Sequence, residues 1–352
     1  MTPESQWVPR RALYSFFATL LAIGVGACQT DDGKVVTNIH DRAMVTFERP
    51  LCRGNIALIE ETMAHVEDSL DVQVQSPIDI TLWSRYADVA DHCWEGALGC
   101  YSDGEIHTLW YGLEHEIVHA VAGPLGRPDP LWIEGIAEAL SGPTRHGEAD
   151  VVSLVGLEDG KEVDYRTAGH FTRWLLEEYG VEGIRALARG SSFEDAYGME
   201  LADANAEYEE NAPWSYPHWN PCRGERLDAT LDGEWEHDIV VDCDDPWSSA
   251  EYESGPTVLR TIDIEEPGTY RLFVTGVRMV GAIACQLETL VEPPAEDVTG
   301  GIVQESAGAT LPTFFLSDQA YEVRLEPGRV QWAITVEGEA ETVGFDLRRV
   351  GP

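Results

Sequence analysis

The sequence contains the string His-Glu-Ile-Val-His at positions 115–119, and a glutamate follows at position 134. Residues four apart in a helix lie on one face, so His115 and His119 can present both imidazoles to one metal ion. Glu116 can take a proton from a water molecule held by that ion. On a second helix, Glu134 can supply the third protein ligand. Three ligands leave one position of a tetrahedral zinc open for water, which is the arrangement of a catalytic site.

The residues around this string favour a buried helix. Apolar residues recur at helical spacing beside the histidines, at Leu113, Ile117, Val118 and Val121. The proline at position 124 predicts the end of this helix, after Ala122. The alternative interpretation is a surface helix whose histidines bind no metal.

Together with Leu-Trp-Ile-Glu-Gly-Ile-Ala-Glu at 131–138, the string resembles the gluzincin metallopeptidases, the clan that includes thermolysin and the zinc aminopeptidases. The resemblance is specific over residues 105–140 and looser from there to about residue 210. It implies a zincin-like catalytic domain, in which a mixed sheet with helices lies above a helical lower lobe. It also implies that Zn²⁺ is bound by three residues of this chain, His115, His119 and Glu134.

The same resemblance assigns roles to the residues beside the ligands. Glu116 is the general base, which takes a proton from water and returns it to the leaving amine. Glu138 matches the acid that orients the first histidine in this clan, where the residue is usually an aspartate. No Gly-x-Met-Glu-Asn string of the aminopeptidases precedes the motif, so the resemblance gives exopeptidase activity no support and favours an endopeptidase.

A hydrolase of this kind needs a hydrogen-bond donor for the oxyanion that develops during attack on the carbonyl. Two residues downstream are candidates for this catalytic role, Tyr165 and His170, in a region where the clan places its lower lobe. The alternative is that Tyr165 is a packed core tyrosine and that His170 lies at the start of a helix.

The amino terminus predicts export. Arg10 and Arg11 precede a short apolar run that ends in Val-Gly-Ala-Cys at 25–28, which is typical of a signal peptide and too short for a membrane span. This ending resembles the bacterial lipoprotein box, so we expect a signal peptide over 1–27 and a lipid on Cys28. Gln29 then favours the outer membrane. The alternative is ordinary secretion.

Charge and cysteines agree with that compartment. The formal net charge is −40, from 63 acidic and 23 basic residues. A surface this negative repels nucleic acid and anionic membrane, so nucleic acid is excluded as a partner and only the lipid is expected to contact the membrane. Six cysteines besides Cys28 predict three disulfides, among fifteen possible pairings. Cys93 and Cys100 are close enough to close one loop. If all six are paired, at least one bridge joins the two halves of the chain.

The predicted fold class is α+β, with a tether and two domains. Residues 28–42 are expected to be a polar tether, 43–211 the catalytic domain and 212–221 a linker. In the catalytic domain the pattern predicts strands at 44–48, 78–82 and 105–109 and a helix over 54–71. By the resemblance, the last of these strands borders the cleft and binds extended substrate by edge pairing.

Residues 222–352 change in character and predict an all-β sandwich. Short alternating segments and repeated Pro-Gly turns follow one another there, at 257–264, 268–275, 283–290, 321–325 and 330–336. This region is similar to the jelly-roll domains appended to secreted bacterial peptidases.

Two functions of different class follow. One is a zinc endopeptidase, acting on a polypeptide substrate and tethered to the bacterial envelope. The other is a non-catalytic envelope lipoprotein that uses a zinc-peptidase scaffold for binding or assembly. The presence of Glu116 favours the zinc endopeptidase, because a general base has no structural role at a zinc site.

Overall fold

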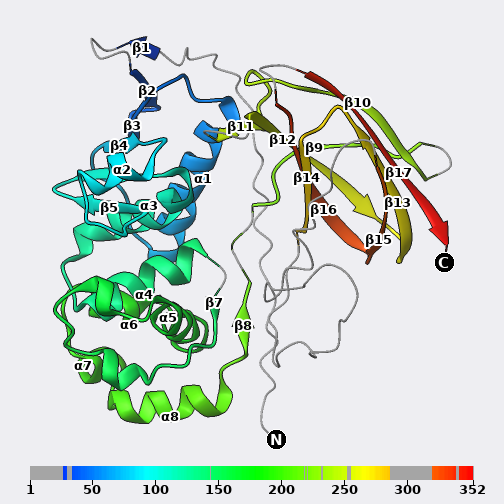
Figure 1. Ribbon diagram of the computed structural model, residues 1–352. Coiled ribbons are helices and arrows are strands. Elements are labelled where there is room, and N and C mark those ends of the chain that lie inside the picture. The colour runs from blue at the N-terminus through cyan, green and yellow to red at the C-terminus, as the bar shows by residue number, and fades with distance from the viewer. Residues whose placement is uncertain are drawn as a thin grey trace, which may run out of the picture.

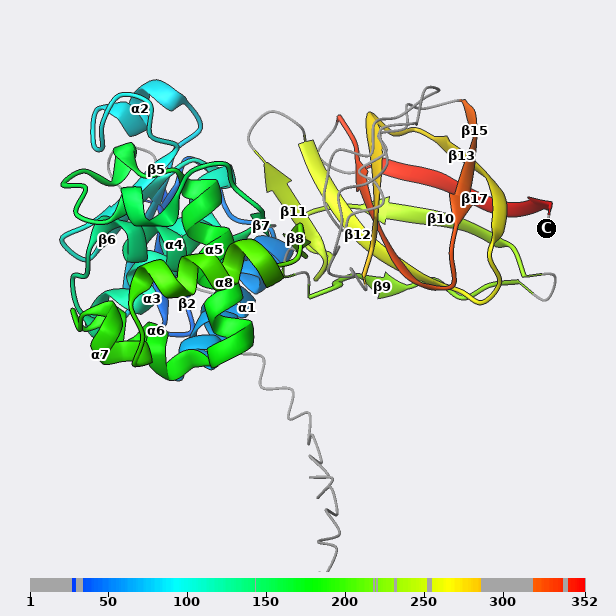
Figure 2. The same cartoon turned by 90° about the horizontal axis from the view of Figure 1, so that it is seen from below.

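The computed structural model describes residues 27–29, 34–142, 144–217, 219, 221–230, 233–251, 255–285, 319–337 and 341–351. Two parts lie side by side, a mixed part from the N-terminal half and a β-rich part from the C-terminal half (Figures 1 and 2). The α+β class and the β-rich C-terminal region are confirmed. The expected signal peptide, apart from Ala27, and the side chain of Cys28 lie outside the described residues.

The N-terminal part is built on a six-stranded sheet. Its order is β1 (Ala27–Gln29), β2 (Val35–Ile39), β3 (Ala43–Phe47), β4 (Ile78–Leu82), β6 (Glu105–Thr108) and β5 (Gly99–Ser102). The pairs β3–β4 and β4–β6 are parallel, and the others are antiparallel. Alternate residues of β3 are buried, as expected of a strand with one face on the core.

Helix α1 (Arg53–Leu70) packs its apolar stripe into the same core. The stripe consists of Ile59, Met63, Val66 and Leu70, all fully buried. These residues recur every three or four positions, so they lie on one face of the helix. The helix and the strands at 43–47 and 78–82 lie where the sequence pattern predicts them.

Two predictions about the sheet are wrong. Residues 35–39 were expected to belong to a polar tether over 28–42, but they form β2, which pairs with β3. The strand at 105–108 was expected to be the edge of the cleft. It lies inside the sheet, because β5 pairs with it and takes the edge position.

Helices form the rest of the N-terminal part, and those from α4 onward lie below the sheet in Figure 1. They are α3 (Leu113–Ala122), α4 (Pro130–Ser141), α5 (Tyr165–Tyr179), α6 (Val181–Ala188), α7 (Phe193–Tyr197) and α8 (Leu201–Asn211), with the short α2 (Tyr86–Ala90) beside the sheet. Asp129 and Asp164 cap the first turns of α4 and α5 by accepting hydrogen bonds from backbone N–H groups. In the described part of the chain, no helix is both long and apolar enough to cross a bilayer.

The C-terminal part is a β-sandwich of two sheets whose strands pair antiparallel, except that β9 runs parallel to β12. One sheet has the order β10 (Trp235–Val241), β17 (Glu341–Gly351), β13 (Gly268–Thr275), β15 (Ala320–Leu325). The other has β11 (Ser248–Glu251), β12 (Gly255–Ile264), β16 (Gly328–Thr335), β14 (Met279–Ala284), with β9 (Glu225–Arg226) beside β12. Side chains of both sheets share one core, in which the rings of Trp332 and Phe345 meet 5.3 Å apart.

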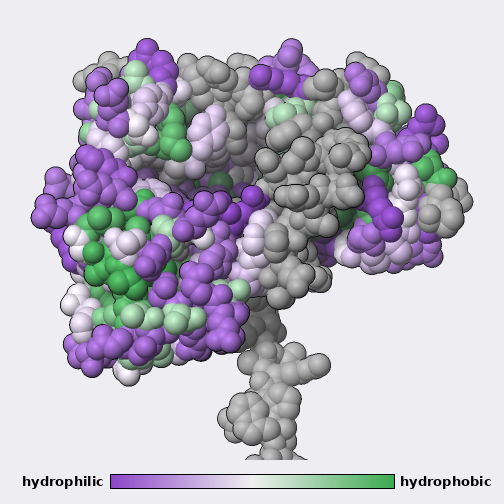
Figure 3. All heavy atoms as spheres, turned by 60° about the horizontal axis from the view of Figure 1, so that its bottom comes forward, coloured by the Kyte–Doolittle hydropathy of each residue, from purple (hydrophilic) through white to green (hydrophobic). Residues whose placement is uncertain are grey.

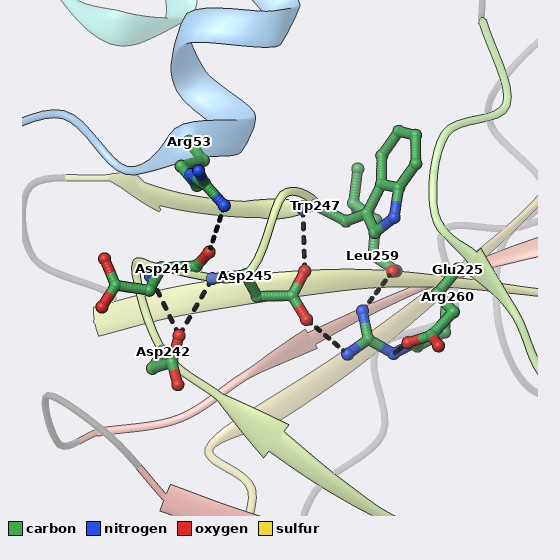
Figure 4. A network of polar contacts seen from close by, with 8 residues as sticks. All are labelled: Arg53, Glu225, Asp242, Asp244, Asp245, Trp247, Leu259 and Arg260. Carbon is green, nitrogen blue, oxygen red and sulfur yellow. Dashed lines mark hydrogen bonds and ion pairs between the residues drawn. The ribbon is translucent and has the colours of Figure 1, made fainter. Parts of the chain in front are cut away.

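Three disulfides are formed, as the cysteine count predicts: Cys52–Cys243, Cys93–Cys100 and Cys222–Cys285. The first joins the two parts across 191 residues of chain. Figure 4 shows the turn beside Cys243, in which Asp242 accepts backbone hydrogen bonds and Asp245 pairs with Arg260 at 2.7 Å. This turn presents Cys243 to the start of α1, where Cys52 precedes the first helical residue.

Candidate metal centre

Helices α3 and α4 bring three side chains with metal-binding atoms together. His115 and His119 lie one turn apart on α3, and Glu134 lies on α4. Their ligand atoms all fall within 4.8 Å of one another. Ile117 and Val121 are buried and, by helical spacing, lie on the side of α3 opposite the histidines, so packing against the core fixes the face that carries the histidines.

The spacing of these atoms suits zinc. The two histidine Nε2 atoms are 2.9 Å apart. Oε2 of Glu134 lies 3.2 Å from Nε2 of His115 and 3.4 Å from Nε2 of His119. Zinc–nitrogen bonds of about 2.0 Å in tetrahedral geometry separate two ligand atoms by about 3.3 Å. A zinc ion therefore fits these three residues with small adjustments, and the donor set of two imidazoles and one carboxylate is one that zinc accepts.

The charges of the cluster are strongly coupled. Burial lowers the pKa of His115, but hydrogen bonds to Glu134 and Glu138 outweigh burial and raise it to about 10. Burial raises the pKa of Glu134, but the two histidines outweigh it and lower it to about 2. The carboxylate is thus held ionised, as a metal ligand must be. A metal ion, if bound, would replace the proton on the ligating nitrogen of His115, because a ligating imidazole nitrogen carries none.

Glu138 contacts His115 at the ring nitrogen that does not face the cluster. Its Oε1 lies 3.1 Å from Nδ1 of His115. With Nδ1 held in this way, Nε2 of His115 points to His119 and Glu134.

Glu116 lies beside the cluster and is 6% exposed. Burial raises the pKa of its carboxyl group, and the neighbouring histidines and the Tyr101 backbone N–H oppose that rise. A Cβ atom at Gly99 would lie 2.8 Å from Cγ of Glu116 and 2.4 Å from Oγ1 of Thr108. The edge strand β5 therefore fixes the position of Glu116 both by a backbone hydrogen bond and by the close approach of a glycine.

The two candidate oxyanion donors lie in different places. Tyr165 lines the cleft that contains the cluster, with its ring 5.9 Å from that of His115. Burial and the Glu134 and Glu116 carboxylates raise the pKa of the Tyr165 hydroxyl well above its usual range, so it stays protonated and able to donate.

His170 does not reach the cleft, so its predicted catalytic role is wrong. Its ring is fully buried, and its Nδ1 forms a hydrogen bond with the Tyr208 hydroxyl at 2.9 Å. Tyr216 and His146 also contact this ring. His170 lies on α5, one and a half turns beyond Tyr165, and that separation turns it from the cleft to the core.

Two residues that β5 brings to the site, Gly99 and Tyr101, were not predicted from the sequence. Gly160, where a Cβ atom would lie 2.7 Å from Oε1 of Glu134, was not predicted either. A glycine inside a strand often marks a close approach by another group, so Gly99 carried a signal that could have been used.

The cluster opens into a cleft of about 1100 Å³ between the sheet and the lower helices. Side chains of β5, α3 and α4 line it, together with Arg127, Lys161 and Tyr165. This volume is slightly above the range of about 300–1,000 Å³ for ligand sites in proteins. Figure 3 shows a mostly hydrophilic face of the molecule, with hydrophobic residues gathered in patches on the N-terminal part.

Comparison with known proteins adds little to this geometry. No protein-family description matches the chain, and no curated protein matches it. Among solved structures, it is similar to the pre-peptidase C-terminal domain of the collagenase from Bacillus anthracis, with 8% sequence identity and a TM-score of 0.21. That match covers 37% of this chain and 100% of that chain. A TM-score this low carries no conclusion about fold or function.

Proposed function

We propose that the chain is a zinc-dependent peptidase with a zincin-like catalytic domain, acting within a polypeptide rather than at its end. The observation that carries the proposal is the set of ligand atoms from His115, His119 and Glu134 within 4.8 Å, with Glu116 beside them in an open cleft. The order and spacing of these residues are those of the gluzincin metallopeptidases.

Zinc, when bound, would polarise a carbonyl group and lower the pKa of a water molecule to about 7. In this proposal Glu116 accepts a proton from that water; the Tyr101 N–H holds its carboxylate, and burial raises its pKa and so makes it a stronger base. Glu116 then carries the proton to the leaving amine. Glu138 orients His115, and the protonated hydroxyl of Tyr165 donates a hydrogen bond to the developing oxyanion.

The edge strand β5 supports a polypeptide as the substrate. It is the last strand of the sheet in the described part of the chain, and its residues 99–102 line the cleft. An extended chain can pair with such an edge by main-chain hydrogen bonds. That mode of binding holds the peptide beside the metal centre without requiring one particular sequence.

We further propose that the protein is attached to the bacterial envelope, with the outer membrane favoured, by a lipid on Cys28. The residues before Cys28 support this location. Three disulfides agree with an oxidising compartment outside the cytoplasm.

The deciding experiment measures zinc content and proteolysis together. The chain from residue 28, carrying Cys28→Ser to prevent lipidation, is compared with His119→Ala and Glu116→Gln. We expect one zinc per chain in the parent and in Glu116→Gln, and much less in His119→Ala. Cleavage of a mixed protein substrate is expected from the parent only, and a chelator should stop it.

Zinc without cleavage would reject the peptidase and leave a binding scaffold. A parent chain without zinc would reject the metal centre itself.

A further inference from the structure

Three large hydrophobic side chains stand exposed around the cleft of the metal centre. Trp94 is 45% exposed, Leu98 52% and Tyr111 76%, and all three line the cleft. Aromatic side chains have much surface to remove from water, and exposed apolar groups gathered at one place mark a binding surface. We call these three residues the apolar shelf.

A short covalent loop holds two residues of the shelf. The Cys93–Cys100 disulfide closes a loop that contains Trp94 and Leu98. Within it, the backbone N–H of Ala97 donates to the Trp94 carbonyl at 3.1 Å. The Leu98 carbonyl accepts hydrogen bonds from the Leu109 N–H at 2.8 Å and from the Thr108 hydroxyl at 3.3 Å. The loop is therefore ordered before any ligand arrives, which lowers the entropic cost of binding.

Tyr111 reaches the same place from the other side. It lies in the 3-10 helix η1 (Trp110–Gly112), just before α3. A Cβ atom at Gly112 would lie 3.3 Å from the Leu98 carbonyl oxygen and 2.7 Å from Oγ1 of Thr108. The turn that carries Tyr111 thus packs directly on the closed loop, and a glycine permits the close approach.

The position of the shelf indicates what covers it. Strand β5 begins at Gly99, immediately after Leu98, so a peptide paired along this edge runs toward the shelf. Every second side chain of an extended peptide points to the same side. Five carboxylate residues line the same cleft, against the two cations Arg127 and Lys161. This excess of negative charge favours a peptide without negative charge.

We propose that Trp94, Leu98 and Tyr111 form a subsite for a bulky apolar side chain of an extended, uncharged or basic polypeptide, and that the Cys93–Cys100 disulfide holds this subsite in shape. The inference rests on the proposed function and deepens it, because it names the residues that select among substrates. In this inference the disulfide also holds the loop that carries Trp94 and Leu98 in the shape that binds substrate, in addition to its effect on stability.

Peptide binding tests this without requiring cleavage. Two fluorescein-labelled decapeptides are used, blocked at both ends and net positive, with Phe at two alternate positions in one and Ala in the other. Affinities are measured by fluorescence anisotropy on zinc-loaded protein carrying Glu116→Gln. Trp94→Ala, Tyr111→Ala and the double variant Cys93→Ser/Cys100→Ser are compared in this background. Phe273→Ala serves as control, since Phe273 is also exposed but lies on β13 of the sandwich.

We expect the Phe peptide to bind about tenfold more tightly than the Ala peptide, as burial of one large apolar side chain implies. The shelf variants should reduce this ratio to about threefold or less with zinc content unchanged, and the disulfide variant should do the same. Phe273→Ala should leave the ratio as it is. The proposal is overturned if the ratio persists in the shelf variants, or if the parent shows no preference.

The two proposals fail separately. Cleavage by the parent chain with no preference for the Phe peptide would remove the subsite and keep the peptidase. Binding that depends on the shelf, with no cleavage by the parent chain, would keep the subsite and remove the peptidase.

Discussion

Glu138 is the residue whose role is easiest to separate from ligation, because it contacts His115 through Nδ1 and supplies no atom to the ligand cluster. We expect Glu138→Gln to weaken zinc binding about 10- to 100-fold, since a partner that orients a ligating histidine also raises its basicity. Competition with a chromogenic chelator measures this. Asp203→Asn, on the exposed face of α8, should not change the affinity; an equal loss there would show that the effect is one of net charge.

His170 is expected to make the protein sensitive to acid. Burial, with His146 and Arg166 nearby, lowers its pKa from 6.5 to about 3. Between these values the unfolded chain binds a proton that the folded chain does not, so stability falls as pH falls, by at most about 1.4 kcal/mol per pH unit. His170→Asn should flatten this part of the stability curve.

Denaturant unfolding at a series of pH values below 7 measures the effect of His170. Tyr208→Phe is the control, because it removes the hydroxyl that contacts His170 and keeps the titrating group. The interpretation is wrong if His170→Asn leaves the slope against pH unchanged.

The residues of the metal cluster could be predicted from the sequence because their geometry is local. The spacing of His115 and His119 is fixed by one helical turn, and Glu134 follows after one short turn of chain. His170 could not be placed in the same way. Its surroundings depend on Tyr208, which lies 38 residues later on another helix, and no periodicity shows which face of α5 that helix covers.

At the scale of elements, strands with strong alternation were predictable and the weak ones were not. Residues 78–82 alternate between apolar and polar and form β4 as expected. Strand β5, with the sequence Gly-Cys-Tyr-Ser, has neither alternation nor β-branched residues. It forms because β6 and the Cys93–Cys100 disulfide hold it. The missed strand is the one that completes the candidate site.

Strand β5 makes a prediction of its own through Gly99. In Gly99→Ala, the new methyl group meets Cγ of Glu116 and the side chain of Thr108 at distances that no real Cβ tolerates. Either Glu116 or the strand must shift, and a displacement of about 1 Å can cost about 100-fold in rate. We expect kcat to fall by that order while zinc content is unchanged. Ser102→Ala in the same strand should remain active; loss of zinc in Gly99→Ala would mean that the whole site is distorted.

At the scale of the whole molecule, one arginine ties the two parts together in addition to the disulfide. Arg223 follows Cys222, and its carbonyl accepts a hydrogen bond from Gln331 of the sandwich. Its side chain is 10% exposed and reaches α1, where it pairs with Glu61 at 3.2 Å and donates to the Gly54 carbonyl at 3.0 Å. The guanidinium group of Arg223 thus lies between two hydrogen-bond acceptors of the N-terminal part, the Glu61 carboxylate and the Gly54 carbonyl.

Arg223 also acts on Glu114, which precedes the first ligand on α3. Burial raises the pKa of Glu114 to about 7, and the Arg223 cation opposes that rise. Glu61 behaves in the same way, with its pKa raised by burial and lowered by Arg223. In Arg223→Met, both carboxyl groups lose this cation, so their folded-state pKa values rise further above 4.5. Arg223 is mostly buried, but the side chain of its partner Glu61 is 36% exposed, so water screens part of their attraction. We expect a loss of about 1–3 kcal/mol at pH 8, between that of a surface pair and that of a buried one.

The loss in Arg223→Met should be smaller at pH 5, because Glu114, whose pKa is raised to about 7, is protonated in the folded state there and needs no cation. Unfolding in urea at both pH values measures it. Arg226→Met provides the matched control: its side chain is 61% exposed and pairs with Asp263 within the sandwich, so its effect should stay below about 1 kcal/mol. If Arg223→Met were as mild as this control, Arg223 would add little to the junction that the disulfide and the hydrogen bonds of Arg53 already form. A large loss that Glu61→Gln or Glu114→Gln partly restores would instead show that the sandwich stabilises the helix carrying the metal ligands through a buried charge.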